Sequence, residues 1–153
     1  MTWTYHADDL DSPDVVALLA LHFESMRASS PRDACHVLPA EGLRAPDISF
    51  WSVREARRLL GIGALKQLTP DHGEVKSMRT APDALGRGVG SAMLRHILTE
   101  ARYRGYRRLS LETGSTEPFA AALRLYQREG FVPCGAFGNY PASKFTSFLT
   151  RQL

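Results

Sequence analysis

Three glycines at two-residue spacing, Gly86, Gly88 and Gly90, stand where the sequence passes from a strand pattern to a helix pattern. Glycine lets the backbone approach a ligand closely because no side chain stands in the way. The helix that follows leaves its first N–H groups without intrahelical partners, and its dipole places partial positive charge at the same end. These features predict a site where main-chain donors bind the phosphate groups of a small molecule.

Two well-known phosphate-binding turns fit this run only in part. A P-loop needs lysine before its Ser or Thr, whereas Ser91 directly follows Gly90. A dinucleotide fingerprint needs its third glycine further along, and it usually follows the first strand of its fold rather than a later one. Because Glu112 lies about where a ribose-binding acid is expected, a nicotinamide-dependent enzyme stays open as an alternative.

A third class fits better. The run Gly86-Arg-Gly-Val-Gly90, after a strand that ends in Thr80-Ala-Pro82, resembles motif A of the GNAT superfamily of N-acetyltransferases. Downstream, Ala122-Leu-Arg-Leu-Tyr-Gln-Arg-Glu-Gly-Phe131 is similar to the A-x-x-L-Y-x-x-x-G-F signature of the same family. Within the family, the chain most resembles the YsnE-like branch of bacterial acetyltransferases. The branch motifs are Leu43–Pro46, Glu74–Thr80, Leu111–Ser115 and Phe131–Gly135.

The resemblance implies acetyl-CoA as co-substrate, with its pyrophosphate held at the glycine turn. It also implies that the strand 77–80 separates from its neighbour after Met78, which leaves the Met78 N–H as an oxyanion donor. Leu85 replaces a frequent Gln or Arg of the family, so we expect Arg87 to supply charge instead. The implied cofactor-binding residues are Met78, Arg79, Thr80, Leu85, Gly86, Arg87, Gly88, Val89, Gly90 and Ser91.

Acetyl transfer to an amine needs a base for the amine and a proton for the departing thiolate. A phenol, with a pKa of about 10, suits the protonation of a thiolate whose pKa is about 8.5. Tyr126 matches the family's general-acid tyrosine, although its helical spacing is also that of a core residue. Glu74 is the candidate base, because its position before the glycine turn matches that of the basic glutamate in some members, and Glu112 is the second candidate.

The acceptor side is less defined by the sequence. Arg44, Trp51, Lys76 and Arg79 suit an acceptor cleft for a carboxylate-bearing amine, or are ordinary surface residues. We expect an N-acetyltransferase that moves an acetyl group to a primary amine of a small molecule or peptide. A non-catalytic acyl-CoA-binding protein with the same fold is the other hypothesis.

The hydrophobic pattern predicts one domain of α/β or α+β class, with a mixed, mostly antiparallel sheet of six to seven strands and about four helices. Expected helices cover 13–26, 88–104 and 118–129, with a short helical turn near 40–43. The first helix should bury Val16, Leu19, Ala20 and Phe23. Expected strands cover 3–6, 48–53, 59–68, 74–80, 108–113, 131–134 and 146–151.

Composition limits the range of partners. The chain has 153 residues, 44% hydrophobic and 23% charged, and a net charge of +3, which is too small to indicate nucleic acid. The sequence shows neither a signal peptide nor an apolar run of membrane-spanning length, so we expect a cytoplasmic protein. Cys35 and Cys134 have no metal-ligand spacing and are expected to be reduced thiols. A homodimer stays open.

Overall fold

The computed structural model describes residues 2–29, 40–115, 117–138 and 140–153. Within this part the chain forms seven strands, three α-helices and three short 3-10 helices. Their order is β1 (Trp3–Ala7), α1 (Pro13–Ser29), η2 (Ala40–Arg44), β2 (Ile48–Glu55), β3 (Arg58–Thr69), β4 (His72–Thr80), η3 (Pro82–Ala84), α2 (Val89–Tyr103), β5 (Arg108–Gly114), η4 (Glu117–Phe119), α3 (Ala120–Arg128), β6 (Val132–Pro133) and β7 (Thr146–Gln152).

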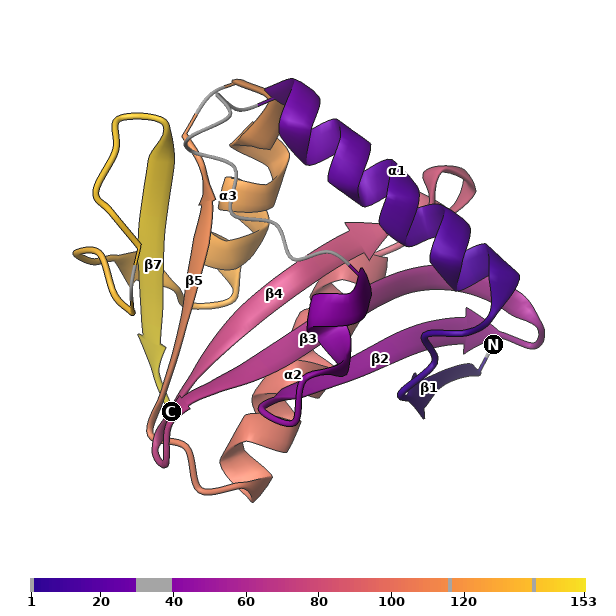
Figure 1. Ribbon diagram of the computed structural model, residues 1–153, viewed down its shortest axis with the longest axis horizontal. Helices are drawn as coiled ribbons and strands as arrows, with labels where there is room; N and C mark the ends of the chain where they lie inside the picture. Colours follow the sequence, from indigo (N-terminus) through magenta and orange to yellow (C-terminus); the bar gives the residue numbers. More distant parts are fainter. Residues whose placement is uncertain (1, 30–39, 116, 139) are drawn as a thin grey trace.

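All the strands belong to one sheet, in the order β1-β2-β3-β4-β5-β7-β6. Neighbouring strands are antiparallel except for β4 and β5, which run parallel and are joined through α2. Helix α1 crosses one face of the sheet and α2 lies behind it (Figure 1). This arrangement confirms the mixed, mostly antiparallel α/β sheet expected from the sequence.

Strand β4 contains a β-bulge at its centre. Ile62 pairs with Arg79 and Ala64 with Lys76, so Gly63 alone faces two residues of β4, and Ser77 has a left-handed φ of 53°. Such a bulge bends a strand and increases its twist. Strand β4 therefore turns away from β5, which continues beside β7.

The two strands separate earlier than the sequence predicted. Their pairing ends at Glu74 and Ser110, whereas the expectation placed the separation after Met78. The bulge lies three residues beyond the last pair with β5, and a bulge of one extra residue has no marked signature in the sequence. Residues 75–80 of β4 consequently have no ladder partner on the β5 side.

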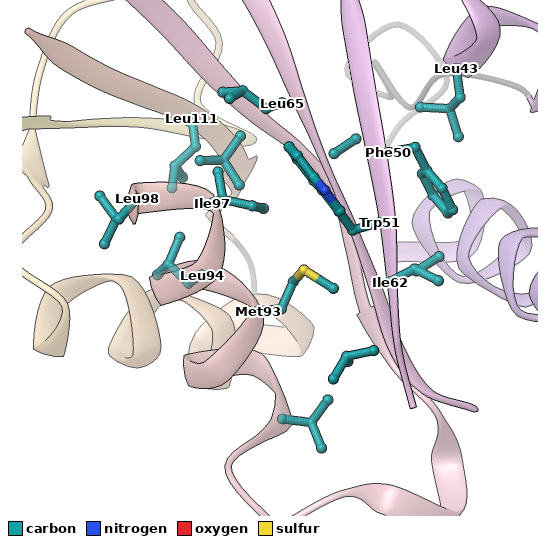
Figure 2. Packing of buried hydrophobic residues seen from close by; sticks show 14 of the residues in the cluster. Leu43, Phe50, Trp51, Ile62, Leu65, Met93, Leu94, Ile97, Leu98 and Leu111 are labelled. Carbon is teal, nitrogen blue, oxygen red and sulfur yellow. The ribbon is translucent and has the colours of Figure 1, made fainter. Parts of the chain in front are cut away.

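Apolar side chains fill both faces of the sheet. Met93 and Ile97 of α2 pack with Trp51 on one face, whereas Phe50 and Ile62 lie on the face covered by α1 (Figure 2). A Cβ at Gly63 would lie 2.7 Å from Met93 Cγ, so this glycine permits the close approach of α2 to β3. The predicted buried face of α2 is confirmed: Val89, Met93, Leu94, Ile97, Leu98 and Ala101.

The predicted buried face of α1 is confirmed only in part. Val16 is 50% exposed and Ala20 is exposed as well, whereas Leu19 is buried and Phe23 is half-buried. The helix carries apolar residues around much of its circumference, so periodicity alone does not fix which side packs on the sheet. The face that is buried in the structure contains Val15, Leu18, Leu19 and His22.

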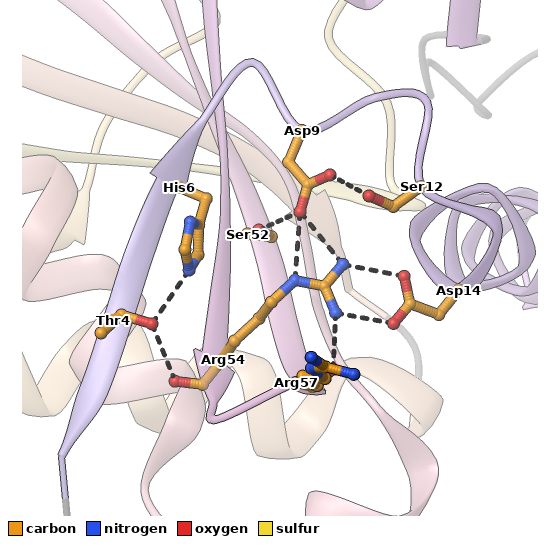
Figure 3. A network of polar contacts seen from close by, with 8 residues as sticks. All are labelled: Thr4, His6, Asp9, Ser12, Asp14, Ser52, Arg54 and Arg57. Atoms are coloured by element: carbon orange, nitrogen blue, oxygen red, sulfur yellow. Dashed lines mark hydrogen bonds and ion pairs between the residues drawn. The ribbon is translucent and has the colours of Figure 1, made fainter.

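A polar network fixes the N-terminal end of α1 to the sheet (Figure 3). The guanidinium of Arg54, on β2, donates to Asp9 at 3.1 Å and to Asp14 of α1 at 2.7 Å. Asp9 also accepts hydrogen bonds from Ser12 and Ser52. Burial alone would raise the pKa of Asp9, but these hydrogen bonds and the charge of Arg54 lower it.

Candidate active site

The separation of β4 from β5 opens a cleft of about 760 Å³. Its walls come from α1, from both diverging strands, from the first turn of α2 and from α3. Most of the predicted site residues line this one cavity. They are Glu74, Lys76, Met78, Arg79, Thr80, Leu85, Gly86, Gly88, Val89, Gly90, Ser91, Glu112 and Tyr126.

One end of the cleft is the N-terminus of α2. Gly88 is the N-cap residue, has a left-handed φ of 83° and provides no side-chain cap. The first intrahelical bond runs from Ala92 N–H to Gly88 C=O, so the N–H groups of Val89, Gly90 and Ser91 have no intrahelical acceptor. Open donors at the positive end of a 15-residue helix form an anion site.

Two side chains of this turn lie differently from the expectation. Arg87 does not line the cleft; its guanidinium donates to both oxygens of Glu55, at 3.2 and 3.1 Å, and stacks on Trp3. The charge expected from Arg87 is thus directed toward β1 and β2. Leu85 is 68% exposed at the rim. Two cations that the sequence reasoning missed, Arg124 and Arg128 of α3, line the cleft.

Tyr126 lies in the cleft wall on α3 and is only 9% exposed. Burial raises the pKa of its phenol to about 12, and the nearby charge of Arg79 acts in the opposite direction. The phenol is therefore protonated near neutral pH. A proton donor in this state beside a cleft is suited to general acid chemistry.

Glu74 is the last residue of β4 that pairs with β5, and its side chain is 2% exposed. Its Oε2 accepts a hydrogen bond from the Tyr140 hydroxyl at 2.7 Å and lies 3.2 Å from Lys76 Nζ. Its Oε1 is buried without a hydrogen-bond partner among the described residues. Since Glu74 pairs in register with Ser110, Glu112 lies two residues further along β5 and faces the same side of the sheet.

Arg79 has a partner that the sequence reasoning missed. Its Nε donates to Nδ1 of His22 on α1 at 3.0 Å, and both residues line the cleft. Burial, followed by the charge of Arg79, lowers the pKa of His22 to about 4, so the imidazole is neutral near pH 7. His22 stands seven residues after Val15, a helical spacing that would have revealed it on the correct face of α1.

Two of the residues predicted for the acceptor side do not reach the cleft. Trp51 is 6% exposed and packs on the α2 face of the sheet, with its ring 5.1 Å from that of His96. Arg44 pairs with Asp11 at 2.6 Å on the surface. Strand alternation places residue 51 on the opposite face of the sheet from residue 50. Because β2 is apolar on both faces, its sequence did not show which of the two faces away from the cleft. Cys35 lies outside the described residues.

Residues 15–131 match the model of the acetyltransferase (GNAT) family. The chain belongs to this family. It is 48% identical over 151 residues to the uncharacterized N-acetyltransferase YedL of Escherichia coli (strain K12), covering 99% of this chain and 95% of that protein. It is 47% identical over 146 residues to the uncharacterized N-acetyltransferase YsnE of Bacillus subtilis (strain 168), covering 95% and 97%.

Solved structures share the fold. A GNAT family acetyltransferase from Elizabethkingia anophelis with acetyl-CoA bound has a TM-score of 0.68 at 19% identity, covering 99% of this chain and 98% of that one. The family and its named relatives confirm the N-acetyltransferase expected from the sequence and support acetyl-CoA as its co-substrate. The nicotinamide alternative is wrong, because a mostly antiparallel sheet is not the doubly wound parallel sheet of that fingerprint.

Among the described residues, no helix is both long enough and apolar enough to cross a membrane.

Proposed function

We propose that this GNAT protein transfers the acetyl group of acetyl-CoA to a primary amine of a small molecule or peptide by direct attack. The observation that carries the proposal is the gap between β4 and β5, which leads from the open N-terminus of α2 to Tyr126. An extended thioester needs a slot of this kind, with phosphate donors at one end and acid–base groups at the other.

The donor is held mainly by main chain. The pyrophosphate takes the N–H groups of Val89, Gly90 and Ser91, where the helix dipole favours negative charge. The pantetheine lies along residues 75–80 of β4, which have no ladder partner on that side and so offer backbone hydrogen bonds. The exposed Arg124 and Arg128 add positive charge at the cleft wall.

The reaction joins three groups of the chain. The neutral amine attacks the thioester carbon, a C–N bond forms, and the oxyanion accepts a hydrogen bond from Met78 N–H. The C–S bond then breaks, and the thiolate takes the phenolic proton of Tyr126. The proton lost by the amine passes to a carboxylate, directly or through water, and solvent later restores the proton of Tyr126.

Glu74 is the better placed of the two carboxylates. Its Oε2 is held by Tyr140 and Lys76, so its orientation is fixed, while Oε1 has no hydrogen-bond partner among the described residues that would compete for the amine proton. Because Oε1 is buried, the proton reaches it through water or through a small movement of Tyr140. Glu112 on β5 is the second candidate base.

The test has two steps. Calorimetry with acetyl-CoA, CoA and NADH measures donor binding, and a panel of primary amines with detection of the released thiol measures transfer. We expect acetyl-CoA and CoA to bind, NADH not to bind, and thiol release with at least one amine. Acetyl-CoA binding without thiol release for any amine would favour the acyl-CoA-binding alternative. Absence of acetyl-CoA binding would refute the proposal.

A further inference from the structure

Arg79 is a half-buried cation whose charge is not neutralised by a carboxylate in the described part of the chain. Its Nε donates to a neutral acceptor, His22, whereas the buried cleft lysine, Lys76, is paired with Glu74. Guanidinium groups withdrawn from water are normally paired with an anion. Unlike the exposed Arg124 and Arg128, Arg79 is therefore a partly buried cleft cation, and it lacks a counter-ion among the described residues.

His22 fixes the orientation of that charge. Since His22 accepts at Nδ1 and is neutral, it carries its proton on Nε2 and contributes no charge of its own. This hydrogen bond uses Nε of Arg79, so the two terminal nitrogens of the guanidinium remain available to a ligand. This end of an arginine presents two parallel N–H groups at the spacing of the two oxygens of a carboxylate.

The position of the pair separates it from the donor site. His22 lies on α1, on the face of the sheet that α1 covers, and Arg79 pairs with Ile62, which points to that same face (Figure 2). Glu74, the candidate base, sits five residues before Arg79 on the same strand. The phosphate donors belong to α2, which lies on the opposite face (Figure 1). Arg79 thus serves the side from which an acceptor approaches.

We propose that Arg79, oriented by His22, binds a carboxylate of the acetyl acceptor, so that the substrates of this enzyme are amines that also carry a carboxylate, such as amino acids or short peptides. This inference rests on the proposed function and adds the chemical class of the acceptor. Arg79 is the specificity-determining residue, and His22 is a positioning residue that acts through it.

The first test measures binding without turnover. Pools of N-acetylated L-amino acids and dipeptides are titrated by calorimetry into the protein saturated with CoA, beside the same compounds with an amidated C-terminus. We expect at least one acid to bind at least tenfold more tightly than its amide. Equal binding of acid and amide across the pools, or no binding of any acid, would overturn the inference.

The second test uses matched variants with acetyl-CoA and the preferred amine. Arg79→Gln should raise the KM for the acid about tenfold or more and leave the KM for the amide unchanged. The affinity for acetyl-CoA should also be unchanged, because the donor uses only the main chain of residues 75–80 and the substitution keeps that main chain. His22→Leu should show the same pattern in weaker form, and His22→Gln, which keeps a hydrogen-bond acceptor, should restore most of the preference. Arg104→Gln removes the same charge at the far end of α2 and is the control.

Other outcomes point elsewhere. If Arg79→Gln weakens acetyl-CoA binding, the guanidinium serves the donor phosphates and the inference fails. If it lowers kcat equally for acid and amide, Arg79 assists Tyr126 and the inference again fails. Failure of the unaltered protein to bind acetyl-CoA refutes the proposed function itself, so the two failures are distinguishable.

Discussion

Tyr126 and Tyr140 lie near the same reaction centre but in different electrostatic surroundings. Tyr126 is buried beside the cation Arg79, which opposes the effect of burial on its pKa. Tyr140 is bound to the carboxylate of Glu74, and burial, the charge of Glu74 and that of Glu112 all raise the pKa of its phenol. A developing negative charge is better tolerated at Tyr126, which supports the proposal that Tyr126 rather than Tyr140 donates the proton to the thiolate.

Tyr126→Phe removes the phenolic proton and keeps the ring. We expect kcat to fall by about 10²-fold or more, the usual value of a positioned acid, while acetyl-CoA affinity stays within twofold. Steady-state kinetics and calorimetry measure the two quantities. Tyr106→Phe, at a buried tyrosine that packs on Gly73 away from the cleft, is the control and should leave kcat unchanged. Unchanged kcat in Tyr126→Phe would make Tyr126 a packing residue.

Glu74→Gln keeps the shape of the side chain but removes its basicity. Without a carboxylate to take the amine proton, we expect the variant to lose about 10²-fold in kcat. The kcat values of Glu74→Gln and Glu112→Gln should be compared at one pH. If only Glu112→Gln lowers kcat, the base lies on β5.

At the level of elements, the turn before α2 combines two requirements in one residue. Gly88 must adopt a left-handed backbone and must leave the first N–H groups of the helix open. Gly105, at the other end of the same helix, has nearly the same φ, 82°, but only ends the helix. In both places an added Cβ would meet nothing within 4 Å, so the two glycines form a matched pair.

Gly88→Ala and Gly105→Ala should each lower the free energy of unfolding by about 1 kcal/mol, the usual cost of a left-handed alanine. Only Gly88→Ala should also weaken acetyl-CoA binding, since the new methyl group and any backbone relaxation lie where the pyrophosphate enters. Urea denaturation and calorimetry separate the two effects. Equal acetyl-CoA affinity in both variants would show that the phosphates bind elsewhere.

Helix α1 carries a pH dependence through His22. The pKa of His22 is about 4 in the folded protein against an ordinary 6.5, so the unfolded chain binds more protons between these values. The contribution of the buried, neutral His22 to the free energy of unfolding is fully present above pH 6.5. As the pH falls toward 4, up to about 3 kcal/mol of that free energy is lost. We expect His22→Gln to flatten the decline of stability over this range. Urea denaturation from pH 7 to 4.5 measures it, and an unchanged slope would contradict the burial of a neutral imidazole.

At the scale of the whole molecule, the sequence predicted what depends on local pattern. The glycine turn, the buried face of α2 and the strands fall within a few residues of their predicted places because each has its own periodicity and punctuation. Features that depend on tertiary contacts were not predictable in the same way. The sheet determines which face of α1 is buried, and Glu55 determines the direction of the Arg87 side chain.

The same limit applied to the cleft. The family resemblance implied that β4 and β5 separate after Met78, but their pairing ends at Glu74 and Ser110, and the bulge follows at Ser77. Nothing local marks this, since a serine with a left-handed φ is unusual and costs energy that the surrounding sheet must offset. Most of the candidate site residues can thus be predicted from the spacing of sequence motifs. Their positions relative to one another depend on the assembled sheet.

The network of Asp9, Asp14, Ser52 and Arg54 attaches α1, and with it His22, to the sheet (Figure 3). The Arg54 side chain is 12% exposed, and its removal would leave Asp9, 14% exposed, as a nearly buried charge without its cation. We expect Arg54→Met to lower the free energy of unfolding by about 3 kcal/mol. Asp9→Asn in the same chain should recover part of the loss, because the uncompensated charge is then gone.

Hydrogen exchange shows how this loss is distributed over the molecule. None of the four network residues lines the cleft, so acetyl-CoA affinity should be unchanged in Arg54→Met. Amides of α1 and β1 should exchange faster than those of α2 and β5, since only the former are attached through the network. A loss below about 0.5 kcal/mol would mean that the network behaves as surface ion pairs do. Equal acceleration in all four elements would mean that α1 does not open separately from the sheet, and that the orientation of His22 is secured by core packing instead.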